Sequence, residues 1–327
     1  MNAKLTFIIT IAVLFFSSNI YSQSTKSDFV PNGKPIVKVF ANYHTDFGEI
    51  TTARIRRAYL GYKYNLSENY KLNLTLDVLN LTGFYQAYLK NAYLKYSKDK
   101  LSYSIGIIPT KQFKVQEKIW GYRYIQKVFS DKYALNASAD LGASAQYKFN
   151  KMISADIIVQ NGTGYKKIKA TKTYRGGAGI TIKPLSGLTL RTYYDLSQKP
   201  EVSKQDFVGF VSYKFKNKFL LAGEYNYQTG FGFVKDKDYG GYSFFARYFL
   251  NKKIELFARY DKVNASVLEN ETEEWFSGIG DYLLGGVQYN PVKGVKFSLN
   301  YQGYHLPLSE KDKYVSLMYF NLEFKIP

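Results

Sequence analysis

Basic side chains recur through segment 110–136, and their type and spacing suit them to electrostatic selection of solutes. The five residues are Lys111, Lys114, Lys118, Arg123 and Lys127. A helix would place the first three of them on one side. Cations that line a narrow aqueous space attract anions, because low-dielectric walls focus the electric field. We therefore regard these five residues as candidate selectivity residues.

Two other residues of the segment have candidate structural roles. Glu117 could hold Arg123 through an ion pair, or it could be solvated. Trp120 is better suited to anchoring the segment by packing than to binding a ligand. A connection of this length without structure of its own is unusual, so we expect the segment to be packed.

Other kinds of chemistry have little support in the residue types. The chain has no cysteine, which excludes disulfides and thiolate metal sites, and it has only two histidines, His44 and His305. A hydrolase needs a nucleophile or an activated water beside a histidine. No accompanying motif is present, so a barrel hydrolase is a remote alternative. We expect no metal and no cofactor.

The elements that must position these residues alternate apolar and polar side chains. Between Tyr70 and Val78, every second residue is apolar and the residues between them are polar. A period of two predicts a strand with one apolar and one polar face. The same pattern recurs over most of the chain from residue 35 onward.

We expect about 16 strands. Their predicted ranges are 35–45, 51–65, 69–79, 86–97, 101–109, 137–149, 152–161, 174–184, 187–197, 205–216, 219–229, 238–250, 253–263, 279–290, 293–304 and 313–326. The links after even-numbered strands are short, and several links after odd-numbered strands are long. This asymmetry is typical of bacterial outer-membrane barrels.

The predicted fold class is therefore all-β, a transmembrane antiparallel β-barrel that covers residues 35–327. Segment 110–136 would be its third outer loop and would fold inward as a constriction. Soluble sandwiches and lipocalin-like barrels also contain alternating strands. They usually have only about 7 to 9 strands, which favours the membrane barrel here.

The first residues predict export. A basic start is followed by an apolar run from Leu5 to Phe16 and by a small polar stretch. We interpret 1–22 as a signal peptide and 23–34 as a short periplasmic segment. The alternative is a membrane anchor, but the run is shorter than the roughly 20 residues that a spanning helix needs. Together with the barrel pattern, this predicts the bacterial outer membrane.

The chain is strongly basic, with a formal net charge of +19. The alternation places cationic side chains of several strands on the polar face, toward the lumen. The candidate lumen-wall residues are Arg57, Lys63, Lys95, Arg191, Arg247 and Arg259. Each of them could set selectivity, or it could pair with an acidic residue of a neighbouring strand. Nucleic acid is an unlikely partner after export, because the lysines are dispersed over strands.

Three runs of residues resemble one known family. The run SIGIIPTKQFKVQEKIWGYRYIQKVFSD from Ser104 resembles the strand and constriction loop of the phosphate-selective porin O/P family, as found in Bacteroidetes-type outer membranes. RIRRAYLGYKY from Arg54 and KNAYLKYS from Lys90 strengthen the likeness. The resemblance implies a 16-stranded porin that is commonly trimeric and prefers anions. The arginine ladder of that family has no residue-by-residue match in this chain.

The sequence thus predicts a porin for passive diffusion of small hydrophilic solutes, with a preference for anions, and the resemblance makes phosphate a candidate solute. Its expected partners are outer-membrane lipid, small anionic or neutral solutes and two further copies of itself. A non-conducting structural or secretion-associated barrel would share every folding feature above, so it stays open as the alternative.

Overall fold

The computed structural model describes residues 29–46, 48, 51–81, 83–169, 173–305 and 314–326. The predicted signal peptide 1–22 and residues 23–28 of the predicted segment 23–34 lie outside these residues. The strands all belong to one compact unit, Asn32–Pro327. No helix among the described residues is long and apolar enough to cross a membrane.

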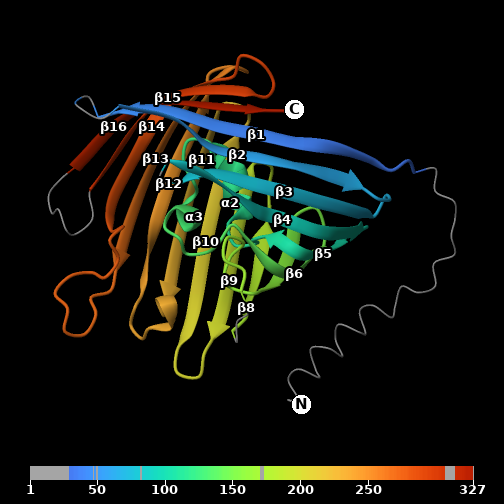
Figure 1. Cartoon of the computed structure of the whole chain (residues 1–327), viewed down its shortest axis with the longest axis horizontal. Coiled ribbons are helices and arrows are strands. Elements are labelled where there is room, and N and C mark those ends of the chain that lie inside the picture. Colours follow the sequence, from blue (N-terminus) through green and yellow to red (C-terminus); the bar gives the residue numbers. More distant parts are fainter. Residues whose placement is uncertain are drawn as a thin grey trace. The chain divides into compact units, whose positions relative to one another are not determined.

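The described part of the chain forms sixteen strands in a single closed antiparallel barrel (Figure 1). The strands are β1 (Asn32–Thr45), β2 (Thr51–Asn65), β3 (Tyr70–Leu81), β4 (Phe84–Lys98), β5 (Leu101–Pro109), β6 (Ala139–Lys148), β7 (Ile153–Gln160), β8 (Arg175–Ile182), β9 (Leu188–Gln198), β10 (Ser203–Phe215), β11 (Phe219–Thr229), β12 (Tyr239–Phe249), β13 (Ile254–Ala265), β14 (Gly280–Tyr289), β15 (Val295–His305) and β16 (Tyr314–Lys325).

Each strand pairs with its neighbours in sequence, and β1 closes the ring by pairing with β16 from Lys38 opposite Lys325 to Thr45 opposite Met318. In Figure 1 these first and last strands, blue and red, lie together at the top of the view. The predicted all-β barrel of 16 strands is confirmed. β1 begins three residues earlier than expected, so residues 32–34 belong to the barrel.

The two faces of the wall have opposite character. On β3, the outward side chains Leu72, Leu74 and Leu76 are 39–51% exposed, whereas Thr75 and Asp77 between and beside them are buried. A water-soluble protein would bury the leucines instead, since apolar burial contributes about 25 cal/mol per Å². Apolar side chains outward and polar side chains inward are what a bilayer-spanning barrel requires.

Short links at one end of the barrel are closed by local side-chain hydrogen bonds. Asn150 Oδ1 accepts from the backbone N–H groups of Met152 and Ile153 at 2.7 and 2.8 Å, and Asn251 Oδ1 accepts from Lys253 and Ile254 at 2.8 and 2.9 Å. Such Asx turns define the tight reversals between strands. They also fix the register of the hairpins that they close.

Candidate functional site

Segment 110–136 connects β5 to β6 and contains two short helices, α2 (Lys114–Trp120) and α3 (Phe129–Lys132). Both are drawn at the centre of Figure 1. Helix α2 ends at Gly121, whose left-handed φ of 74° lets its N–H reach the Glu117 carbonyl at 3.1 Å. Lys111 precedes the helix, so only Lys114 and Lys118 of the three expected lysines are helical.

The segment contacts strands from much of the ring. Its aromatic and aliphatic side chains form one buried cluster with residues of β1, β2 and β10–β14, among them Phe40, Phe210 and Tyr282. The strands that contribute to this cluster are far apart in the ring, and each contributes side chains from its buried face. The segment is therefore packed against buried side chains of the wall.

Trp120 lies at the centre of this packing and is fully buried. Its ring centroid is 5.0 Å from that of Phe245 and 5.1 Å from that of Tyr122, both in edge-to-face arrangements. Its indole N–H donates to the Gln126 carbonyl at 2.9 Å. Truncation of such a buried side chain to alanine typically costs about 3–5 kcal/mol.

Arginines of the wall donate to the backbone of the segment. Arg191 donates to the Lys111 carbonyl at 2.7 Å, Arg247 to that of Ile119 at 3.0 Å, and Arg259 to that of Lys127 at 2.5 Å. The same three arginines also form ion pairs with acidic residues of the wall. The pairs are Arg191 with Asp156, Arg247 with Glu255 and Arg259 with Asp261. The charges of these predicted wall residues are thus largely compensated.

Arg56 of β2 makes the densest of these backbone contacts. Its guanidinium donates to the carbonyls of Arg123, Tyr124 and Ile125 at 3.4, 2.6 and 3.1 Å. Arg56 thus supplies donors to three consecutive carbonyls of the segment. A planar guanidinium is suited to the task because its five N–H donors have a fixed geometry.

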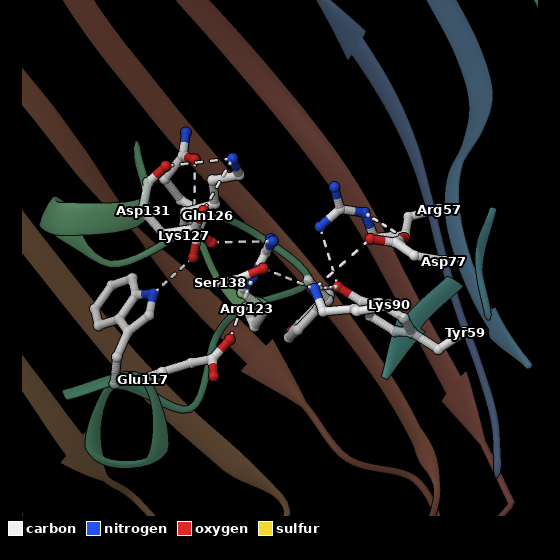
Figure 2. A network of polar contacts seen from close by, with 12 residues as sticks. Arg57, Tyr59, Asp77, Lys90, Glu117, Arg123, Gln126, Lys127, Asp131 and Ser138 are labelled. Atoms are coloured by element: carbon white, nitrogen blue, oxygen red, sulfur yellow. Dashed lines mark hydrogen bonds and ion pairs between the residues drawn. The ribbon is translucent and has the colours of Figure 1, made fainter. Parts of the chain in front are cut away.

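Figure 2 shows the polar network between the segment and the β2–β4 wall. Within the segment, Glu117 contacts Lys114 at 2.6 Å and Arg123 at 3.4 Å. Asp131 contacts Arg123 and Lys127, each at 3.2 Å. The ion pair of Glu117 with Arg123 is one of the two arrangements considered from the sequence.

On the wall side of the same network, Asp77 is fully buried and gathers three partners. Arg57 approaches it at 3.2 Å and Lys90 at 3.6 Å, and the hydroxyl of Tyr165 donates to it at 2.5 Å. Lys90 also donates to Ser138, two residues after the end of the segment, at 3.0 Å. The network therefore connects the wall to the C-terminal end of the segment.

The carboxylates Glu117 and Asp131 of the segment are held in their ionised states. Burial acts to raise the pKa of Glu117, but Lys114 and Arg123 outweigh it and hold the pKa below its ordinary value of 4.5. Asp131 is similar, since burial is outweighed by Arg123 and Lys127. Burial lowers the pKa of Lys132 to about 7, although Asp261 opposes that shift.

Four lysines at the short-link end of the barrel are arranged differently. Lys34, Lys63, Lys71 and Lys95 line a cavity of about 580 Å³ together with asparagines and Tyr93. Lys34 lies opposite Lys63 in the β1–β2 register, and Lys71 lies opposite Lys95 in the β3–β4 register. Among the described residues none of the four has an acidic partner within ion-pair distance. Like charges directly opposite one another destabilise a sheet.

A second basic cavity lies at the same end of the barrel. It measures about 540 Å³ and is bordered by the β8–β9 link. Lys151, Lys183 and Lys214 line it together with Ile119 of α2. Lysines without an acidic partner among the described residues thus line two cavities at the short-link end, whereas Arg191, Arg247 and Arg259 contact the segment.

The structure therefore divides the residues proposed from the sequence into groups. Glu117, Arg123 and Lys127 meet in one ion-pair network, and Lys114 joins it, while Lys118 is exposed. Lys63 and Lys95 belong to the lysine-lined cavity instead. The remaining wall residues are arginines with acidic partners. They are Arg57, Arg191, Arg247 and Arg259.

Sequence reasoning missed Arg56 and Lys90. A strict period of two assigned Arg57 to the inner face and therefore Arg56 to the outer face. The structure has an extra residue in β2 and another in β4, which turns both side chains inward. The available signal was the run of adjacent basic residues at Arg56 and Arg57, which breaks the alternation.

The two histidines do not form a common site. His44 lies opposite Tyr319 of β16 and stacks on its ring at 4.8 Å, whereas His305 lies opposite Tyr314. These two positions on β16 are about 17 Å apart at 3.4 Å per residue. The two histidines therefore do not meet across the closure of the barrel. Among the described residues, no group of three or more His, Asp or Glu side chains could hold a metal ion.

Comparison with known proteins finds similarity in fold only. No protein-family model matches the chain. A search of curated proteins likewise finds no match.

Solved outer-membrane proteins share the architecture at low identity. Salmonella typhi OmpF, in a complex with daunomycin, has a TM-score of 0.66 and 12% identity over 90% of this chain and 97% of its own. The trimer form of OmpT, an outer membrane protein of Vibrio cholerae, has a TM-score of 0.63 and 12% identity over 91% and 100%. A variant of the Rh. blastica porin has a TM-score of 0.56 and 10% identity over 91% and 100%.

Proposed function

We propose that the protein is a porin of a bacterial outer membrane that allows passive diffusion of small hydrophilic solutes and prefers anions. The barrel wall has apolar side chains outward and polar side chains inward, which supports a membrane location. The fold is also that of solved porins. In this proposal residues 1–22 are the export signal, and segment 110–136 narrows the aqueous path.

One observation carries the anion preference. The lysine-lined cavity places Lys34 opposite Lys63 and Lys71 opposite Lys95 without acidic partners among the described residues. This arrangement costs stability unless anions compensate it. A basic, confined aqueous space raises the local concentration of anions and excludes cations. The resemblance to the phosphate-selective family adds phosphate as a candidate solute.

The trimer form of a solved protein with this fold supports a homotrimer as the assembly of this chain. A closed ring of three copies is a common symmetric solution for identical subunits. In a bilayer, a trimer would open in groups of three equal conductance steps.

The experiment is single-channel recording of the purified protein in a planar bilayer under a salt gradient. We expect stable open steps and an anion-selective reversal potential. The double variant Lys63→Gln, Lys95→Gln should shift that potential toward zero. The matched control, Lys98→Gln with Lys100→Gln, removes the same charge from exposed positions outside the cavity and should leave the potential nearly unchanged.

Substitution of phosphate for chloride in the same experiment tests the solute. Current carried by phosphate would support the finer proposal, and its absence would leave a general anion porin. A folded barrel that never conducts would overturn the porin proposal. It would favour the non-conducting structural or secretion-associated barrel, with segment 110–136 as a plug.

A further inference from the structure

Two irregularities of strand pairing occur in the same part of the wall. In β2, Arg57 lies opposite Phe40 and Ile55 lies opposite Ala41, so Arg56 has no partner in β1. In β4, Asn91 lies opposite Thr75 and Leu89 opposite Leu76, so Lys90 has no partner in β3. Each is a β-bulge of one extra residue, and in each the extra residue is basic.

A bulge changes the direction of a side chain. In a regular strand adjacent residues point to opposite faces, so Arg56 and Arg57 could not both point inward. Here Arg57 contacts buried Asp77 while Arg56 contacts the backbone of segment 110–136. Bulges commonly re-aim a side chain in this way. Inward direction of these two cations therefore depends on the bulges.

The two re-aimed side chains contact the segment region at separate points. Arg56 donates to three consecutive carbonyls, of Arg123, Tyr124 and Ile125, in the middle of the segment. Lys90 donates to Ser138, where the segment joins β6, and its side chain is only 14% exposed. Hydrogen bonds from charged donors are the stronger ones.

We infer that the bulge residues Arg56 and Lys90 are positioning residues that hold segment 110–136 at a defined distance from the β2–β4 wall. The inference about position stands on the contacts alone. Its consequence, that the two residues set the free cross-section of the pore and its upper limit for solute size, rests on the proposed porin function.

The chain has no cysteine, so a single introduced thiol can report on the position of the segment. Ile125 is 1% exposed, and its carbonyl accepts from Arg56. In the Ile125→Cys protein we expect slow reaction with a water-soluble thiol reagent. Arg56→Met should increase the rate by about tenfold, because it removes hydrogen bonds from a charged donor. Lys90→Met should give a smaller increase, since its contact Ser138 lies beyond the end of the segment and farther from Ile125.

Arg54→Met is the matched control. Arg54 belongs to the same strand and carries the same charge, but it is exposed and its side chain contacts Asn42 rather than the segment. This variant should leave the labelling rate unchanged. Arg56→Lys keeps the charge but has fewer hydrogen-bond donors, so it should give an intermediate labelling rate. If charge alone were important, its labelling rate would equal that of the protein with Arg56.

Conductance supplies a second readout. Arg54→Met and Arg56→Met remove one positive charge each and should shift the reversal potential by similar amounts. Only Arg56→Met should increase the conductance and admit larger neutral solutes. Deletion of Arg56 is a further variant, because it restores regular pairing and leaves every pair on both sides of the bulge intact. It should match Arg56→Met.

Heat-modifiable gel mobility identifies folded barrels before either measurement. Equal labelling rates in folded Arg54→Met and Arg56→Met proteins would overturn the inference. Faster labelling of Arg56→Met in a protein that never conducts would support the positioning role and contradict the porin function. The two proposals can therefore fail separately.

Discussion

The arginines and the lysines of the inner face have different partners. Arg191, Arg247 and Arg259 each contact one carboxylate and one backbone carbonyl of segment 110–136. A guanidinium can serve both because its donors form a rigid planar fork and it is weakly hydrated. The lysines that line the two cavities have no such carboxylate contact among the described residues. A strongly hydrated ammonium on a flexible stem is better suited to mobile anions.

The carboxylates Glu117 and Asp131 should make the position of the segment depend on pH. Glu117 and Asp131 have pKa values below their ordinary 4.5 and 3.8, so their contacts with Arg123 stabilise the folded segment above these values. That stability is lost as the pH falls through the lowered values. We expect Ile125→Cys labelling to be constant from pH 8 to about pH 5 and to increase only in more acidic solution, after correction for thiolate content.

Asp131→Asn provides the control for this prediction. It removes one of the two carboxylates at every pH, so labelling should be faster already at neutral pH and should change less on acidification. A change that is complete between pH 7 and pH 6 would contradict the prediction. It would assign the response to another group, such as Lys132 with its pKa of about 7.

At the scale of elements, the short helix α2 depends on its C-terminal residue. Gly121 has a φ of 74°, and a Cβ there would lie 3.2 Å from Arg247 Nη1. Left-handed conformation costs a non-glycine residue about 1–2 kcal/mol. The close contact would also disturb the hydrogen bond from Arg247 to Ile119.

We expect Gly121→Ala to lower the thermal stability and to change the channel conductance. Gly232→Ala is the matched control, because Gly232 has a φ of 67° but nothing lies within 4 Å of its added Cβ. Gly232→Ala should lower the thermal stability by a similar amount, because its backbone is also left-handed, but it should leave the conductance unchanged. Identical conductance in the two variants would show that the end of α2 has no influence on the pore.

At the scale of the whole molecule, the basic excess predicts a dependence on ionic strength. The formal charge is +19, and lysines without acidic partners among the described residues line cavities at one end of the barrel. Screening shortens the Debye length from about 10 Å at 0.1 M salt to about 3 Å at 1 M. Selectivity that arises from this field must therefore weaken in concentrated salt.

We expect the anion-to-cation permeability ratio, measured from reversal potentials, to fall between 0.1 M and 1 M potassium chloride. The Lys63→Gln, Lys95→Gln variant should show a weaker dependence because part of the field is absent. A ratio that is independent of salt would indicate direct anion contact at a narrow point of the segment. It would then assign selectivity to the segment rather than to the cavity.

The sequence by itself determined the architecture. Three local properties of the chain were sufficient. They are the alternation of side chains with a period of two, the short turns such as those at Asn150 and Asn251, and the alternation of short and long links. They predicted every strand within a few residues of its observed bounds, from β2 at 51–65 to β16 at 314–325. Local pattern was sufficient because side-chain direction and turn geometry depend on near neighbours in sequence.

Only the tertiary structure decided which charges are paired and which side chains reach the segment. Arg191 and Lys63 look alike in the alternation, yet one contacts Asp156 and the Lys111 backbone and the other lines an open cavity. Arg56 and Lys90 point inward because of register shifts against β1 and β3. Pairing across strands joins residues that are distant in sequence, and a single inserted residue reverses the direction of a side chain.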